Sequence, residues 1–269
     1  AKIAWNESNA EESPGDILSS FDSNGFTLGD SAAVNGSSDT FVAWCWKESA
    51  TAGFDIITYS GTGSAKNESH SLSATPHWIL TKCRSTAQSW ATHHKSYSAT
   101  EKVMYLDNNN ALASTDPDWI TAVSSSTISL GGSGSDANTS GRTYVAYLWS
   151  EKQGFSKFGS FTGNGNDDGT FVHTGFRPAW TMIKCTSATD HWPIDDNKRS
   201  TSNFMQNTLR ANLSNAEYTG SAYGIDFLSN GFKVRNDDGQ YNLSGGTFVY
   251  MAFAEAPFVN SNGVPANAR

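Results

Sequence analysis

A six-residue stretch of the sequence recurs twice in altered form, and this self-similarity constrains the fold more than any other feature. "FVAWCW" at 41–46 is followed by "YVAYLW" at 144–149 and "FVYMAF" at 248–253, at spacings of 103 and 104 positions. "PHWILTKC" at 76–83 and "PAWTMIKC" at 178–185 lie 102 positions apart. Because a fixed period is typical of chains built from repeated structural units, we expect units of about 100 residues.

The repeated stretches have the character of buried strands. Each "FVAWCW"-type stretch holds six apolar residues rich in aromatic and β-branched types, which is too short for a buried helix. Polar turn-forming runs such as "NGSSDT" and "ANTSGRT" precede the copies. Strands at short, regular spacing with turns between them indicate sandwiches or barrels. We therefore predict an all-β chain of tandem antiparallel β-sandwich modules, each closed by one "FVAWCW"-type core strand.

The repeat also predicts the domain boundaries. Residues 1–50 are expected to form a segment that completes a preceding β module. Residues 51–150 are expected to form the first β-sandwich repeat, and residues 151–269 the second repeat with a C-terminal tail. The boundary near residue 150 carries no Pro- or Gly-rich linker, so the two units are expected to abut rigidly.

Charge and composition exclude several classes of partner. Charged residues make up 16% of the 269 residues and the formal net charge is −8, with no basic stripe, so binding to nucleic acid or to an anionic membrane surface is not expected. No apolar run approaches the roughly 20 residues that cross a bilayer, so no membrane insertion is expected. Aromatic residues make up 12% of the chain, so much of its core must be aromatic.

No motif indicates a cofactor, a metal or an enzyme. The three cysteines are odd in number and form no CxxC pair, which predicts buried free thiols and neither a disulfide framework nor a zinc site. The glycine clusters lack the lysine and the helix of a nucleotide site. The acidic pairs at 167–168 and 237–238 indicate turns first, a divalent cation second and catalysis last.

Aromatic and polar residues supply the candidates for ligand binding. Most tryptophans recur at the repeat spacing, which favours core packing, whereas Trp119 has no counterpart and is expected to be freer to lie exposed. The loop after Trp192, "PIDDNKRSTSN", is dense in hydrogen-bonding groups. The candidate ligand-binding residues are Trp119, Trp192, Asp195, Asp196, Asn197 and Lys198.

Several long phrases of the sequence resemble a known family. "YVAYLWSEKQGFSKFGSFTGNGNDDGTFVHTGFRPAWTMIKCT", "DFLSNGFKVR" and "GGTFVYMAFAEAPFVNSNGVPANAR" are similar to repeat-built tail fibre or virion appendage proteins of marine and cyanobacterial tailed phages. The resemblance covers residues 17–269. It implies lectin-like or jelly-roll-like β-sandwich modules in extended, often trimeric appendages. It implies no catalytic residues; the cysteines at 83 and 185 depart from the family's pattern.

These observations lead to ranked expectations for function. The first is a phage virion structural protein, a tail fibre or appendage whose lectin-like modules attach to a host-surface glycan. Its expected partners are further copies of itself, as a trimer in the family's manner, and other virion proteins. The alternative is a capsid decoration or fibre-shaft protein without a ligand. A bacterial surface adhesin and a glycan depolymerase come last, because the sequence places no carboxylate pair across a groove.

Overall fold

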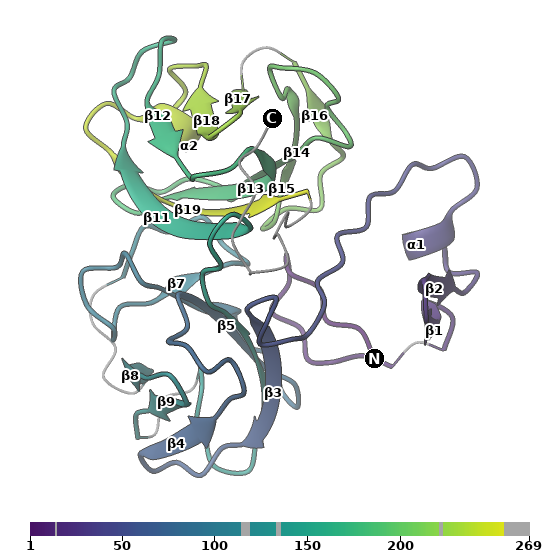
Figure 1. Ribbon diagram of the computed structural model, residues 1–269. Helices are drawn as coiled ribbons and strands as arrows, with labels where there is room; N and C mark the ends of the chain where they lie inside the picture. Colours follow the sequence, from purple (N-terminus) through teal and green to yellow (C-terminus); the bar gives the residue numbers. More distant parts are fainter. Residues whose placement is uncertain (14, 114–118, 133–135, 221–222, 256–269) are drawn as a thin grey trace.

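Two β-sandwich modules and an N-terminal arm make up the chain (Figure 1). The computed structural model describes residues 1–13, 15–113, 119–132, 136–220 and 223–255. The prediction of an antiparallel all-β fold is confirmed, since each pairing between named strands is antiparallel. The tail expected at 256–269 lies outside the described residues.

The first module consists of a broad sheet and a small sheet. The broad sheet has, in spatial order, β3 (Phe54–Ser60), β10 (Thr143–Trp149), β5 (Trp78–Cys83), β6 (Ala91–His94) and β7 (Met104–Tyr105). The small sheet has β4 (Lys66–Ser69), β9 (Thr127–Leu130) and β8 (Ile120–Val123). The "YVAYLW" stretch is thus the inner strand β10, with neighbours on both sides.

The second module has the same strand order with one further strand. Its broad sheet has β11 (Ser156–Thr162), β19 (Thr247–Ala254), β13 (Pro178–Cys185), β14 (Pro193–Asp196), β15 (Asn207–Arg210) and β16 (Tyr218–Thr219). Its small sheet has β12 (Phe171–His173), β18 (Gly231–Val234) and β17 (Ile225–Leu228). The single-turn helix α2 (Gly239–Asn242) precedes β19. The "FVYMAF" stretch is again an inner strand, β19, next to the edge strand β11.

Strand β5 shows how one stretch serves two cores. Side chains alternate between the two faces of a strand. Trp78 and Leu80 therefore face the neighbouring module, whereas Ile79 and Cys83 pack inside their own module. All six residues of β5 are buried, including the polar Thr81 and Lys82.

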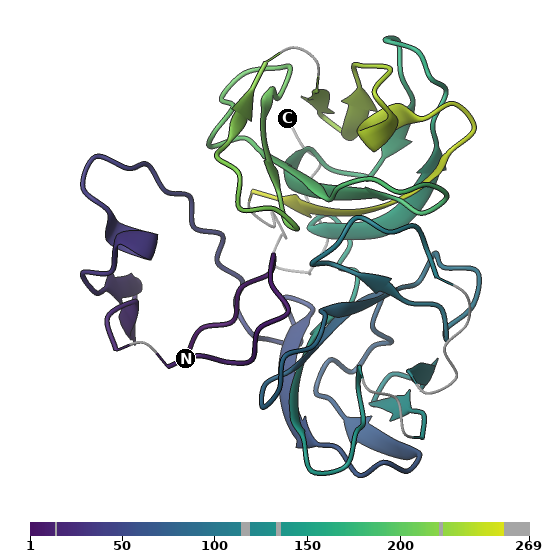
Figure 2. The ribbon, with the colours of Figure 1, turned by 180° about the vertical axis from the view of Figure 1, so that it is seen from behind.

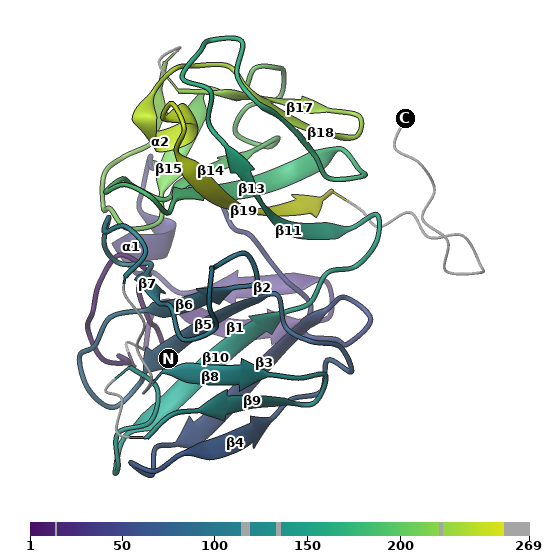
Figure 3. The same ribbon diagram turned by 90° about the vertical axis from the view of Figure 1, so that its left-hand side faces the viewer.

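The two broad sheets pack against each other through an aromatic core, and Figure 3 shows the resulting layers from the side. Trp78 stacks on Trp149 of the same module with ring centroids 4.3 Å apart. It also meets Phe158 of the second module at 6.4 Å. Trp180 and Trp192 enter this core from the other side. Five of the six recurring tryptophans are core residues, as predicted, but this core lies between the modules, and the sixth, Trp46, is only half-buried.

The N-terminal arm lies beside both modules (Figure 2). It contains the hairpin β1 (Leu18–Asp22) and β2 (Gly25–Leu28), followed by the single-turn helix α1 (Ala32–Asn35). Ser23 and Asn24, residue types common in tight turns, connect the two strands, and Asp22 pairs with Gly25 across the turn. All nine residues of β1 and β2 are exposed.

The "FVAWCW" stretch departs from its prediction. Residues 41–46 form no strand, and Phe41 is 52% exposed. Strands β10 and β19 are buried because each has a neighbour on both sides, whereas no described residue pairs with 41–46 in a sheet. Cys45 is consequently an exposed thiol, which corrects the expectation of three buried cysteines, while Cys83 and Cys185 are buried and free as expected.

Candidate functional site

A groove separates the arm from the second module. Its volume is about 840 Å³. One wall comes from residues 42–54 and the other from β13, β14, β19 and the segment 152–155. The lining is mostly apolar in the middle and polar at the rim, and it includes three of the predicted ligand residues: Asp196, Asn197 and Lys198.

Aromatic rings form the floor of the groove. Trp46 lies edge-on to Trp180 and to Phe253, with centroids 5.5 and 5.7 Å apart. Trp44 is 6.2 Å from Trp180 in the same edge-to-face manner. Such pairs add to the stabilisation from burial alone. The two arm tryptophans are only half-buried, so the floor keeps apolar surface in contact with solvent.

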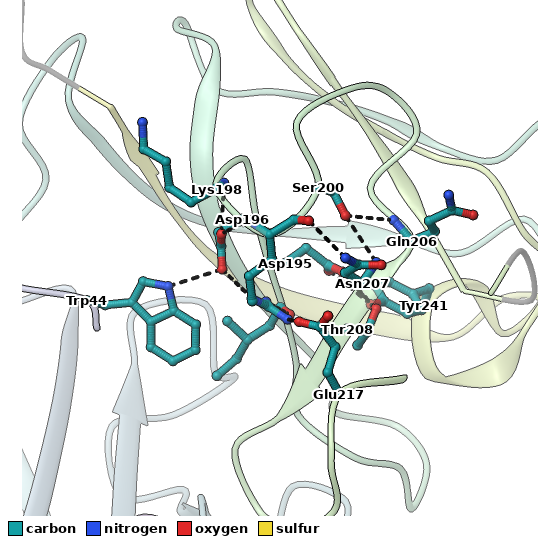
Figure 4. A network of polar contacts seen from close by, with 12 residues as sticks. Trp44, Asp195, Asp196, Lys198, Ser200, Gln206, Asn207, Thr208, Glu217 and Tyr241 are labelled. Atoms are coloured by element: carbon teal, nitrogen blue, oxygen red, sulfur yellow. Dashed lines mark hydrogen bonds and ion pairs between the residues drawn. The ribbon is translucent and has the colours of Figure 1, made fainter. Parts of the chain in front are cut away.

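Asp196 fixes the arm to the second module, as Figure 4 shows. The indole Nε1 of Trp44 donates to its Oδ2 at 3.1 Å, and Arg199 Nε donates to the same oxygen at 2.6 Å. Burial by itself would raise the pKa of Asp196. The backbone and side-chain hydrogen bonds from Arg199 outweigh burial and hold the pKa below its usual value. Asp196 is therefore a charged structural anchor.

Asp195 lies on the opposite side of β14 from Asp196, because adjacent strand residues face opposite ways. Its carboxyl accepts hydrogen bonds from the hydroxyls of Thr208 at 2.9 Å and of Tyr241 at 2.9 and 3.1 Å. It is fully buried, and burial raises its pKa to about 7. Asp195 therefore lies inside the second module and offers no surface to an external ligand, although it was predicted as a site residue.

Asn197 and Lys198 form an exposed part of the rim. The Lys198 ammonium pairs with the carboxylate of Glu255, and Asn197 Nδ2 donates to the other carboxylate oxygen at 3.2 Å. The hydrogen bonds from Lys198 lower the pKa of Glu255. These three side chains remain open to solvent and to a polar ligand.

The two tryptophans among the predicted site residues lie in cores. Trp119 is 0% exposed and packs inside the first module, so the expectation that it is exposed is wrong. Trp192 is buried between the modules, where its Nε1 donates to the carbonyl oxygens of Tyr105 and Asn108, each at 3.1 Å. Neither ring has a face open to a sugar.

The described residues show neither a metal cluster nor a membrane-crossing helix. No group of three or more His, Cys, Asp or Glu side chains among them is placed to hold a metal ion. In the same part of the chain, no helix has the length and apolarity to cross a bilayer.

Comparison with known proteins identifies the family. A family described as "Domain of unknown function (DUF7483)" matches residues 1–257. The chain belongs to the DUF7483 family. The DUF7483 match includes the N-terminal arm as well as both modules, so the groove lies within one family domain. No curated protein and no solved structure matches the chain.

Sequence reasoning missed most of the groove. The groove residues it did not single out for a site include Trp44, Trp46, Trp180, Phe253 and Glu255. No alternation of apolar and polar residues marks the stretch "FVAWCW", because all six of its residues are apolar. Its half-buried position at a groove therefore could not be distinguished in the sequence from that of a strand buried on both faces.

Proposed function

We propose that this DUF7483 protein is a structural component of a phage virion, in a tail fibre or related appendage that attaches to a host-surface glycan. The observation that carries the proposal is the aromatic core between the two sandwich modules. Such a core joins the modules rigidly, as an appendage under mechanical load requires. The sequence resemblance to phage appendage proteins supports the same assignment.

Glycan attachment is best placed at the exposed rim residues Asn197 and Lys198. An amide and an ammonium group supply hydrogen bonds to sugar hydroxyls, and the ion pair with Glu255 holds the ammonium in position. The corresponding loop of the first module, at Lys95, is likewise exposed although the sheet beneath it is covered by the second module. A ligand at this rim therefore needs no access to the apolar floor.

A second candidate function is a fibre shaft or capsid decoration without a ligand. It is favoured by the burial of four predicted ligand residues in internal contacts: Trp119, Trp192, Asp195 and Asp196. In this role the groove serves only the packing of polypeptide against polypeptide.

Retention on immobilised envelope polysaccharide from candidate host cells distinguishes these functions. We expect specific retention without released fragments, and its loss in the double variant Asn197→Ala with Lys198→Ala. The control variant Lys102→Ala with Asn215→Ala removes the same kinds of group outside the groove and should be retained. Absence of retention across a broad polysaccharide panel would favour the shaft or decoration role, and released fragments would point to a depolymerase.

A further inference from the structure

Two extended segments of the chain contact the modules in corresponding ways. We call residues 1–12 the N-terminal strap and residues 105–112 the middle strap. The N-terminal strap contacts the first module and the middle strap contacts the second. In both cases backbone carbonyl oxygens of the strap accept hydrogen bonds from a buried lysine and a buried tryptophan.

The lysines lie at corresponding places in the central part of each broad sheet. The ammonium of Lys82 in β5 donates to the carbonyl oxygen of Ser8 at 2.7 Å. The ammonium of Lys184 in β13 donates to the carbonyl oxygen of Asn109 at 3.2 Å. Each lysine also donates to a carbonyl oxygen six residues further along its own module. Both side chains are fully buried, so the carbonyls replace their hydration.

The tryptophans repeat this arrangement. Trp90 Nε1 donates to the carbonyl oxygen of Ala4 at 2.7 Å, and Trp192 Nε1 donates to that of Tyr105 at 3.1 Å. Ser8 follows Ala4 by the same four positions by which Asn109 follows Tyr105. The N-terminal strap therefore contacts the first module in the same way as the middle strap contacts the second module. The middle strap is itself part of the first module.

The arm continues this correspondence beyond the strap. In the second module the hairpin β17–β18 is followed by helix α2, capped by Asp238, and then by the inner strand β19. In the arm the hairpin β1–β2 is followed by helix α1, capped by Ser31, and then by the extended residues 40–47. Residues 1–47 thus have the elements of the second half of a module in the same order.

The first half of that module has no counterpart among the described residues. In the second module, β18 pairs with β12, and β19 is flanked by β11 and β13. In the arm, β2 pairs only with β1, and residues 40–47 belong to no sheet. Phe21 in β1 is 85% exposed as a result.

At the groove, residues of both modules are more exposed than the corresponding residues at the junction between the modules. Phe158 in β11 is fully buried against Trp78 of the preceding module. Ile56 occupies the corresponding place in β3, because each of these two residues pairs with the residue that lies two positions before the last aromatic residue of the neighbouring strand. Ile56 is 37% exposed. Similarly, the side chain of Glu151 is 21% exposed at the junction of the modules, and that of Glu255 at the groove is 58% exposed.

The aromatic rings indicate the geometry of the vacant place. Trp46, Trp149 and Phe253 are the last aromatic residues of the three "FVAWCW"-type stretches. The Trp46 ring lies 6.4 Å from that of Trp149 and 5.7 Å from that of Phe253. The arm and the two modules therefore meet around one cluster of aromatic rings, each on its own side of it. On the arm's side only the second half of a module is present among the described residues.

We propose that the groove and the arm accept a β half-module, a polypeptide segment with the strand pattern of residues 51–101. This segment would supply neighbours to residues 40–47, cover the floor at Trp44 and Trp180, and complete a third sandwich. The floor is continuous with the aromatic core that already joins the modules, which is why a sheet bearing an aromatic face fits it. The occupant should carry Trp and Lys at the places of Trp90 and Lys82. The segment after β15, around Ser214, corresponds to the middle strap and would contact this Trp and this Lys of the occupant.

A chain with an added half-module tests the proposal. Residues 51–101 are duplicated directly before Ala1, because Ala4 corresponds to Tyr105 and the added segment then ends in register. We expect hydrogen exchange of the amides at 41–46 to slow by about tenfold or more relative to the native chain, with the oligomeric state of the chain unchanged. Amides of β10 and β19 report in the same experiment that both modules are folded. A control carries Trp78→Asp in the added copy only, which places a charge in the aromatic core and should leave the arm exchanging as in the native chain.

A second version guards against misfolding of one added segment. It adds residues 153–206, which end at the corresponding point of the second module. Arm amides that exchange as fast in both versions as in the native chain would overturn the proposal, as would equal protection in the Trp78→Asp control. A native chain that dimerises and protects the same amides without any added segment would show that a second copy fills the groove, and would also overturn it. Glycan retention at Asn197 and Lys198 is measured separately and does not bear on this outcome.

Discussion

At the scale of single residues, corresponding tryptophans have unequal surroundings. Trp149 is buried between strands β3 and β5 and stacks on both Trp78 and Phe54, at 4.3 and 4.7 Å. Trp46 touches the same core only from the half-buried arm. The contribution of each ring to stability depends on how much of it leaves water.

Substitution of these two rings should therefore give different losses. We expect Trp149→Ala to lower the free energy of unfolding by about 3–5 kcal/mol, the range for a large aromatic residue in a core. Trp46→Ala should cost about 1–2 kcal/mol, because a half-buried ring removes less apolar surface from water. Urea denaturation followed by far-UV circular dichroism measures both, with Phe21→Ala as an exposed control. Equal losses for the two tryptophans would show that the arm is as firmly packed as β10.

At the scale of elements, strand β6 carries two buried titratable groups, His94 at the interface between the modules and His93 on the opposite face of the strand. His94 Nε2 lies 3.2 Å from the carbonyl oxygen of Tyr250 in β19, so β6 also links the two modules. Burial lowers the pKa of His93 to about 4 and that of His94 to about 3. Both rings are neutral in the folded protein at neutral pH, whereas they take up protons near pH 6.5 when unfolded.

This difference predicts acid destabilisation. A histidine with a lowered folded pKa stabilises the fold above its unfolded pKa, and that stabilisation is lost as pH falls from about 6.5 toward 3. We expect the melting temperature of the native chain to fall over this window. His94→Gln keeps a donor for the Tyr250 carbonyl without titrating, so the fall should be shallower, while the exposed control His173→Gln should follow the native chain. Parallel pH profiles for His94→Gln and the native chain would exclude His94 as a cause.

Element by element, the sequence predicts those strands whose pairing partners lie within the same module. Strands β10 and β19 could be predicted because a continuous apolar run in a sandwich implies burial on both faces. The stretch 41–46 has the same composition and yet forms no strand, because its burial depends on neighbouring strands and not on its own residues. Asp195 and Asp196 could be noticed as polar neighbours, but their opposite roles follow only from the alternation of β14 between a core and a groove. The period of about 100 residues stays a sequence-based prediction.

At the scale of the whole molecule, the shared core couples the two modules. Residues of both broad sheets pack in one aromatic cluster, so neither sheet can unfold without exposing the face of the other. A boundary of this kind differs from the polar, hydrated contacts usual between domains.

We accordingly expect both modules to unfold together. Calorimetry should give one transition whose calorimetric and van 't Hoff enthalpies agree. Phe158→Asp at the interface should separate it into two, because a charge among the rings weakens module contact more than it weakens either inner core. Two transitions in the native chain would contradict the coupling inferred from the aromatic cluster.

The capping of Lys82 and Lys184 by main-chain oxygens has an evolutionary consequence. Every residue type offers the same backbone carbonyl group, so nearly all side chains of a strap can change without loss of its hydrogen bond to the lysine. Selection then acts on the backbone conformation of the strap and only weakly on its amino-acid sequence. Relatives that fasten their straps in this way would diverge there into sequences that no longer align, while the docked conformation is inherited intact.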